Sequence, residues 1–315
     1  MHDPDEPTAC CGPSRGDAVP TVPAATEAAP SNRPTDRRGM VRLDGGTFAM
    51  GDEGPLANPF DGEGPVRDVH VDPFWIDEIA VTNRAFATFV KQTGFVTDAE
   101  RFGWSFVFAG LVPPEVRPSV ERFVEGARWW AVVPGAHWKQ PEGPGTSIGQ
   151  RPMHPVVHVS HDDAVAYCAW AGRRLPTEAE WEFAARGGLA QATYPWGDEL
   201  RPGRRWLCNI WQGTFPTTNT LDDGHLGTAP ARSYPPNGYG LYEMTGNVWE
   251  WTSDAWRVDH VDGSPPPVDG HVVRRGGSYL CHDSYCNRYR VSARDHSRVD
   301  DATGNIGFRC AADVT

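Results

Sequence analysis

Residues 174–182 read Arg174-Leu175-Pro176-Thr177-Glu178-Ala179-Glu180-Trp181-Glu182, and they carry the clearest structural signal in the sequence. Thr177 with Glu180 three positions later is a capping box, in which each side chain accepts a hydrogen bond from the other residue's backbone N–H. Apolar residues beginning with Trp181 follow, and Gly187-Gly188 is typical of a helix end. The stretch therefore predicts a short helix with one face in the core.

Two more helices are predicted before this one. Thr82 can cap a helix that carries Phe86 and Phe89 on one face and ends at Gly94. Asp162 can cap a second helix, whose first turns carry several apolar residues. Three short helices leave most of the chain to strands and loops.

Short strands are predicted where the ordered region begins. Residues 40–43 lead into residues 45–51, an apolar stretch with glycine turns at both ends. Residues 69–71 and 74–76 alternate apolar with polar side chains on either side of Asp72-Pro73. This pattern predicts a hairpin.

The composition predicts an irregular, loop-rich α+β domain. The chain of 315 residues contains 34 Gly and 29 Pro, which break long helices, and 13 Trp, which can fill a core that regular elements do not supply. Residues 40–315 contain no internal repeat and no linker, so they are expected to form a single domain. Residues 1–39 are rich in Pro, Ala, Ser and Thr and are expected to be a disordered tail.

The net charge of −12 argues against nonspecific binding to nucleic acid, which needs clustered Lys and Arg. It is compatible with basic peptides or metal cations as partners. No run of 18 apolar residues occurs, so no membrane span is expected. The N-terminus is acidic and lacks the apolar core of a secretory signal, which indicates a cytoplasmic protein, with a monomer as the default state.

The chain has seven cysteines. An odd number without a secretory signal favours reduced thiols, a metal site or catalysis over a disulfide scaffold. Cys10 and Cys11 lie in the predicted tail, where incidental exposed thiols are the simplest interpretation. Cys208 has no obvious partner, and buried packing is its expected role.

The sharpest chemical feature is the pair Cys281 and Cys286, five positions apart after Gly276-Gly277. Two thiols at this spacing can converge at a turn. Soft sulfur ligands select Cu(I), whereas Zn²⁺ would require four ligands. A redox dithiol or two unrelated buried thiols fit the spacing equally well, because the environment of a thiolate decides its function.

Residues 209–250 are rich in Asn, Asp, Glu and Gly. Carboxylate, amide and backbone carbonyl oxygens are the ligands that Ca²⁺ prefers, although the spacing does not match an EF-hand. Asn and Asp also make turns without any ion, and on the residues alone this interpretation is favoured.

Taken together, several motifs resemble the sulfatase-modifying-factor family, in order over roughly residues 40–313. Residues 277–290 further resemble the active site of formylglycine-generating enzymes of the actinomycete type. The resemblance implies a single-domain variant of the C-type-lectin fold with little regular secondary structure. The motifs are residues 45–51, 174–182, 195–197, 237–251, 275–278 and 307–310.

The resemblance also implies an activity. In that family the paired cysteines, here Cys281 and Cys286, bind Cu(I), and the thiolate of the substrate cysteine completes the site. O₂ then oxidises that cysteine to Cα-formylglycine, with an external thiol or another reductant. Ser278 and Trp249 match positions beside the metal and the oxygen pocket. The implied substrate is an unfolded sulfatase precursor, or a peptide, with a Cys-x-Pro-x-Arg motif bound in a surface groove.

The family resemblance further implies structural Ca²⁺. One set of matching positions is Asn209, the Ile210 carbonyl, Asp223 and the His225 carbonyl. A second set is Glu243, the Gly246 carbonyl, the Val248 carbonyl and Glu250, with Glu243 standing where relatives can have Asn. Cys168 and Cys310 match the two halves of a disulfide of secreted relatives.

Two other functions are weaker interpretations. An iron-dependent sulfoxide synthase of the same superfamily would need an additional helical domain with three His ligands, for which residues 1–39 are too short. A non-catalytic, lectin-like binding module would have no reason to place Cys281 and Cys286 in this context.

Overall fold

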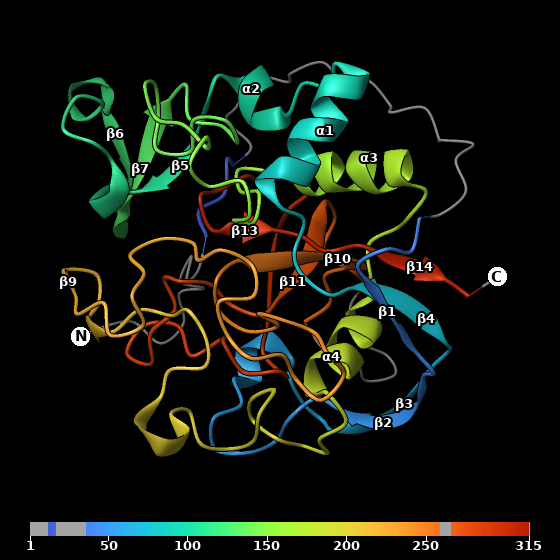
Figure 1. The fold of residues 1–315 in the computed structure, drawn as a ribbon. Helices are drawn as coiled ribbons and strands as arrows, with labels where there is room; N and C mark the ends of the chain where they lie inside the picture. Colours follow the sequence, from blue (N-terminus) through green and yellow to red (C-terminus); the bar gives the residue numbers. More distant parts are fainter. Residues whose placement is uncertain (1–11, 17–35, 259–265, 315) are drawn as a thin grey trace.

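The computed structural model describes residues 12–16, 36–258 and 266–314 (Figure 1). Within these ranges the helices are few and short, as the many glycines and prolines predict. They are the α-helices α1 (Asn83–Thr93), α2 (Asp98–Phe102), α3 (His161–Ala171) and α4 (Glu178–Arg186), and the 3-10 turns Pro59–Asp61, Ala109–Leu111, Arg117–Ser119 and Pro202–Arg204. No helix in the described ranges is long and apolar enough to cross a membrane.

The strands are also short and form several small sheets. The largest has the order β12-β11-β10-β13, with β13 parallel to β10 and the other neighbours antiparallel. Two three-stranded sheets have the orders β1-β4-β14 and β5-β7-β6, and β2-β3 and β8-β9 are pairs. The strands are β1 (Met40–Leu43), β2 (Gly46–Met50), β3 (Arg67–Val71), β4 (Phe74–Asp77), β5 (Trp104–Phe108), β6 (Arg122–Val124), β7 (Ala127–Pro134), β8 (Gly213–Thr214), β9 (Thr218–Asn219), β10 (Trp249–Ala255), β11 (His271–Arg275), β12 (Arg294–Arg298), β13 (Ile306–Gly307) and β14 (Ala311–Asp313).

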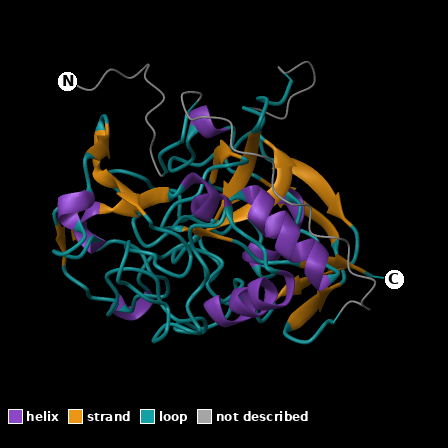
Figure 2. Ribbon diagram, turned by 90° about the horizontal axis from the view of Figure 1, so that it is seen from above, coloured by secondary structure: helices purple, strands orange, loops and turns teal. Residues whose placement is uncertain are grey.

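The main core joins the helices to the largest sheet. Figure 1 shows α1 and α3 on one side of β10, β11 and β13, and α4 on the other, while Figure 2 shows long loops connecting the small sheets. One apolar cluster contains Phe86 of α1, Tyr167 of α3 and Trp251 of β10, together with five buried cysteines, Cys168, Cys208, Cys281, Cys286 and Cys310. The cysteine loop is therefore part of the core and not a surface appendage.

Helix capping confirms two predicted helices and corrects a third. The side chain of Thr82 accepts a hydrogen bond from Ala85 N at the start of α1, and the Thr177 capping box begins α4. The predicted cap of α3, Asp162, is wrong by two residues. Ser160 caps it, because its side chain and that of Asp163 satisfy each other's backbone N–H groups. A similar box at Thr97 begins α2, a helix that was not predicted from the sequence.

The predicted hairpin of residues 69–71 and 74–76 is wrong, although both strands exist. β3 pairs with β2, and β4 lies between β1 and β14. Phe74 and Ile76 of β4 are fully buried. The backbone N–H and C=O groups of a buried strand need hydrogen-bond partners on both edges, and segments from the two ends of the domain provide them.

The predicted fold class is confirmed as one α+β domain with little regular structure. Its first strand begins at Met40, as expected. Residues 12–16, inside the predicted disordered tail, are also described and lie against the domain.

Candidate active site at the cysteine pair

The structure brings Cys281 and Cys286 together. Their Sγ atoms lie 3.3 Å apart, and only 1% and 2% of the two residues is exposed. This separation exceeds the bond length of about 2.05 Å in a disulfide, so the two sulfurs are not bonded to each other. Cys286 is disulfide-bonded in this structure, so the two sulfurs could hold one soft ion between them only after that bond is reduced.

Tight turns in the loop between β11 and β12 create this pair. Cys281 N donates to the Ser278 carbonyl at 2.9 Å, and Cys286 N donates to the His282 carbonyl at 2.7 Å. Ser278 N in turn donates to the Cys281 sulfur at 3.3 Å. Gly277 has φ +71°, and a Cβ there would lie 2.8 Å from the Arg288 carbonyl oxygen. Glycine is required at this position because the two ends of the loop approach so closely.

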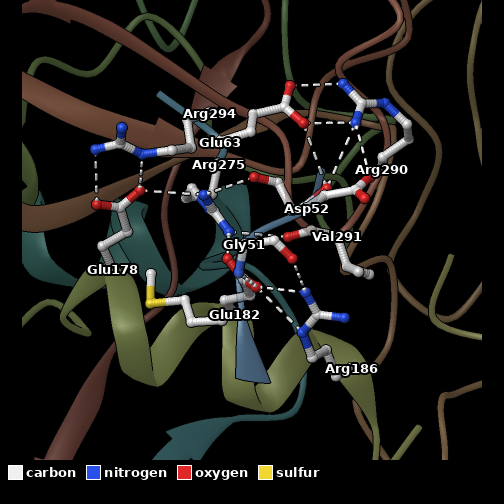
Figure 3. A network of polar contacts seen from close by, with 12 residues as sticks. Gly51, Asp52, Glu63, Glu178, Glu182, Arg186, Arg275, Arg290, Val291 and Arg294 are labelled. Carbon is white, nitrogen blue, oxygen red and sulfur yellow. Dashed lines mark hydrogen bonds and ion pairs between the residues drawn. The ribbon is translucent and has the colours of Figure 1, made fainter. Parts of the chain in front are cut away.

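Buried ion pairs hold both ends of the loop (Figure 3). At the start, Arg275 pairs with Glu178, at 3.1 Å, and with Glu182, both on α4. At the end, the guanidinium of Arg290 binds both carboxylate oxygens of Glu63, each at 2.6 Å. Fully buried pairs with several hydrogen bonds are directional, so these contacts fix where the loop begins and ends.

Ser278 is held beside the pair by Asn305. Asn305 Nδ2 donates to Ser278 Oγ at 2.9 Å, and the Thr303 hydroxyl donates to Asn305 Oδ1 at 2.5 Å. The loop that carries Asn305 is supported by His158, whose backbone N donates to the Thr303 carbonyl. Burial lowers the pKa of His158 to about 3, so this imidazole is neutral. Asn305 was not predicted from the sequence, because a Gly-Asn pair indicates only a turn.

Trp249 packs in the same apolar cluster as the cysteine pair. It is fully buried, and its backbone N donates to the Asn305 carbonyl at 2.9 Å. The guanidinium of Arg274 lies over its ring, 4.9 Å from the centroid. The backbone of Trp249 therefore supports the Asn305 loop, its side chain packs in the same cluster as the thiols, and it does not line the pocket described next.

An aromatic pocket opens onto the sulfurs. Tyr285 stacks on Phe215 with ring centroids 4.6 Å apart, and the edge of Trp129 meets the Tyr285 ring at 4.9 Å. These aromatic rings exclude water from the pocket. Charged thiolates are unfavourable in an apolar environment of this kind unless a soft cation offsets their charge. This pocket was not predicted from the sequence. Its lining is Trp129, Trp130, Phe215, Ser278, Leu280, Cys281, Tyr285 and Cys286.

Known proteins are similar to this chain in sequence and in fold. Residues 25–314 match the sulfatase-modifying factor enzyme 1-like domain. The chain belongs to this family. It is 60% identical to the formylglycine-generating enzyme of Thermomonospora curvata over 88% of this chain and 94% of the relative. It is 59% identical to the enzyme of the same name from Streptomyces coelicolor, over 94% and 96%.

One further relative and one solved structure show how far the similarity extends. A mouse protein named inactive Cα-formylglycine-generating enzyme 2 is 48% identical over 87% of this chain and 85% of its own. The structure of PvdO from Pseudomonas aeruginosa has a TM-score of 0.63 at 27% identity, covering 87% of this chain and 94% of that one. Since the family includes a member named inactive, the residues of the site must carry any statement about activity.

The first predicted calcium set of this family member fits a hard cation. Asn209 Nδ2 donates to the Gly227 carbonyl and to Asn247 Oδ1, at 2.9 and 3.2 Å. The buried Asn209 Oδ1 and Asp223 Oδ2 have no hydrogen-bond partner of normal geometry among the described residues. Burial raises the pKa of Asp223. Two orphaned oxygens of this kind are what a bound Ca²⁺ would satisfy. The Ile210 carbonyl accepts a hydrogen bond from Gln212, and His225 N donates to Asp223 Oδ1 at 3.0 Å.

The second predicted calcium set fits less well. Arg309 binds both carboxylate oxygens of Glu250, at 2.6 and 2.8 Å, and the Trp181 indole donates to one of them. Glu243 accepts hydrogen bonds from the backbone N–H groups of Arg232 and Tyr234. A buried guanidinium so close to Glu250 opposes a second cation. The described residues contain no cluster of three His, Cys, Asp or Glu side chains arranged around one point.

The remaining cysteines have different settings. Cys168 and Cys310 are buried with their Sγ atoms 3.3 Å apart, so the structure brings together the pair that the resemblance implies, without a bond at this distance. Burial, together with Cys168, raises the pKa of Cys310. Cys208 is buried and burial raises its pKa, in agreement with a packing role. Cys10 and Cys11 lie outside the described residues.

Proposed function

We propose that this chain oxidises the cysteine of a Cys-x-Pro-x-Arg motif in sulfatase precursors to Cα-formylglycine, and that Cys281 and Cys286 hold Cu(I) for this reaction. The observation that supports this proposal most strongly is the pair of buried sulfurs, 3.3 Å apart, in the lining of an aromatic pocket. The names of the two actinomycete relatives support the same activity. The proposal includes O₂ and an external thiol as co-substrates, and a cytoplasmic, monomeric enzyme.

The residues of the site have distinct roles in this proposal. Bound Cu(I) would supply a soft centre at which a third sulfur, from the substrate, and O₂ can meet. The Ser278 backbone N–H orients the Cys281 sulfur, and Asn305 fixes the Ser278 hydroxyl at the pocket wall. The aromatic rings keep water away from the reacting thiol. The buried ion pairs of Arg275 and Arg290 keep the loop in one conformation.

Mass spectrometry tests the proposed activity directly. A Cys-x-Pro-x-Arg peptide incubated with the copper-loaded protein, air and a thiol reductant should lose the mass that corresponds to replacement of CH₂SH by CHO. The product should also react with a hydrazide. The same peptide with serine in place of cysteine is the control and should stay unchanged. An unchanged cysteine peptide would refute the proposed activity.

We also propose one structural Ca²⁺ at Asn209 and Asp223. Removal of calcium with a chelator should lower the Tm by a few °C, because loss of a ligand present at about 100 times its Kd costs about 2.7 kcal/mol. The variant Asp223→Asn should start from a lower Tm and no longer respond to the chelator. The exposed neighbour Asp222→Asn is the matched control and should respond like the parent. Equal chelator responses in both variants would contradict the site.

A further inference from the structure

A short piece of the N-terminal tail is seated on the domain. Residues 12–16 appear in Figure 1 as a coloured segment within the grey N-terminal trace. Pro13 and Arg15 are buried, whereas Ser14 and Gly16 are exposed. Such alternation is typical of an extended peptide lying with one face against a protein surface. The domain therefore buries alternate residues of this segment.

Arg15 makes the most contacts. Its backbone N donates to Asp301 Oδ1 at 2.7 Å, and its guanidinium donates to the backbone carbonyls of Asp300 and Trp104, each at 3.2 Å. The guanidinium carbon lies 4.3 and 4.2 Å from the ring centroids of Phe102 and Trp104. Ser14 Oγ adds a hydrogen bond of 3.2 Å to the same Asp301 oxygen. Only 6% of Arg15 is exposed.

The surroundings of Arg15 are acidic. Burial lowers the pKa of the Arg15 guanidinium, but only to about 10, because Asp301 and, more weakly, three other carboxylates attract the positive charge. Arg15 is therefore charged at neutral pH. An acidic pocket with two aromatic rings recognises an arginine by charge and by stacking together. The three other carboxylates belong to Asp98, Asp163 and Asp300.

The segment leads from this acidic pocket towards the cysteine site. Trp104, at its arginine end, begins β5 opposite Pro134 and so lies at the far end of β7 from Trp129 and Trp130 of the aromatic pocket. At the other end, a Cβ on Gly12 would lie 2.5 Å from an Arg274 nitrogen. The Arg274 guanidinium lies over Trp249, which packs in the cluster of Cys281 and Cys286.

The sequence of the seated segment matches the proposed substrate. Cys11-Gly12-Pro13-Ser14-Arg15 has the form Cys-x-Pro-x-Arg. The two fixed positions after the cysteine, proline and arginine, are the buried ones, and the exposed Ser14 is a variable position. From Gly12 to Arg15, the most buried residues are therefore those that the motif fixes. Cys11 itself lies outside the described residues, and the match at that position rests on the sequence.

We propose that this N-terminal segment is an internal copy of the substrate motif that occupies the substrate groove in cis, so that an incoming substrate must displace it. This inference rests on the proposed function for the identity of the motif. Because the segment is part of the same chain, its effective concentration at the groove is high even if its intrinsic affinity is modest. The apparent affinity for substrate then falls by the fraction of molecules in which the groove is open.

The variant Arg15→Ala tests whether the N-terminal segment competes with substrate. It removes the guanidinium from the acidic pocket but changes no residue of the site, so the KM for a Cys-x-Pro-x-Arg peptide should fall about tenfold while kcat stays the same. Arg38→Ala removes an exposed arginine from the next described part of the tail and is the matched control, with an unchanged KM. An equal KM in the parent and in Arg15→Ala would overturn the inference.

A binding measurement separates this inference from the proposed activity. A fluorescent Ala-x-Pro-x-Arg peptide cannot react, so its anisotropy reports groove occupancy without copper or turnover. It should bind Arg15→Ala about tenfold more tightly than the parent. A synthetic peptide of residues 8–16 should then compete with it, and the same peptide with alanine at position 15 should not. Failure to compete overturns the inference, whereas competition without any turnover would refute only the proposed activity.

Discussion

Cys281→Ala is expected to lower kcat/KM for a Cys-x-Pro-x-Arg peptide by more than about 100-fold. Loss of a hydrogen-bond partner outside the ligand shell already costs about 10–100-fold in metal affinity or activity, and here one of two proposed ligands is removed. The remaining sulfur of Cys286 cannot hold the ion and position it against the substrate alone. Steady-state turnover at saturating Cu(I), followed by mass spectrometry, measures the effect.

The matched control for this variant is Cys208→Ala. Cys208 is also a fully buried cysteine of the same apolar cluster, so the truncation costs a similar amount of packing. It does not line the aromatic pocket. Cys208→Ala should retain turnover, with a loss of stability of about 1 kcal/mol. Turnover by Cys281→Ala within a few-fold of the parent would show that the reaction does not need the pair.

Local signals were predictable from the sequence, and contacts between distant segments were not. The box at Thr177 predicted α4 because both of its hydrogen bonds form within four residues. The pair at Cys281 was ambiguous because its geometry depends on Glu63 and on α4, far away along the chain. β4 was placed in the wrong pairing for the same reason, since its partners come from the two ends of the domain.

The thiols of the site could be predicted from the sequence, and the aromatic residues that line its pocket could not. Sulfur has a specific chemistry, so the sequence alone marks Cys281 as a candidate functional residue. Trp129 and Phe215 have no such chemistry, because an aromatic residue in a sequence indicates a core far more often than a pocket. The seated segment was missed for a different reason. Its composition indicates disorder, and only the acidic aromatic pocket around Arg15 gives it a place on the domain.

Glu63→Gln is expected to destabilise the domain by about 3–5 kcal/mol, the usual cost of removing one partner from a buried ion pair. Both side chains are almost completely buried, so Arg290 would keep its charge in the core without a full counter-ion. Asp36→Asn, which breaks the exposed pair with Arg38, is the control and should change the free energy of unfolding by less than about 1 kcal/mol. Urea denaturation measures both variants. Because Arg290 ends the cysteine loop, Glu63→Gln should also weaken Cu(I) binding under conditions where the protein is still folded. A full loss of stability with unchanged Cu(I) affinity would show that the ion pair supports the fold and does not position the sulfurs.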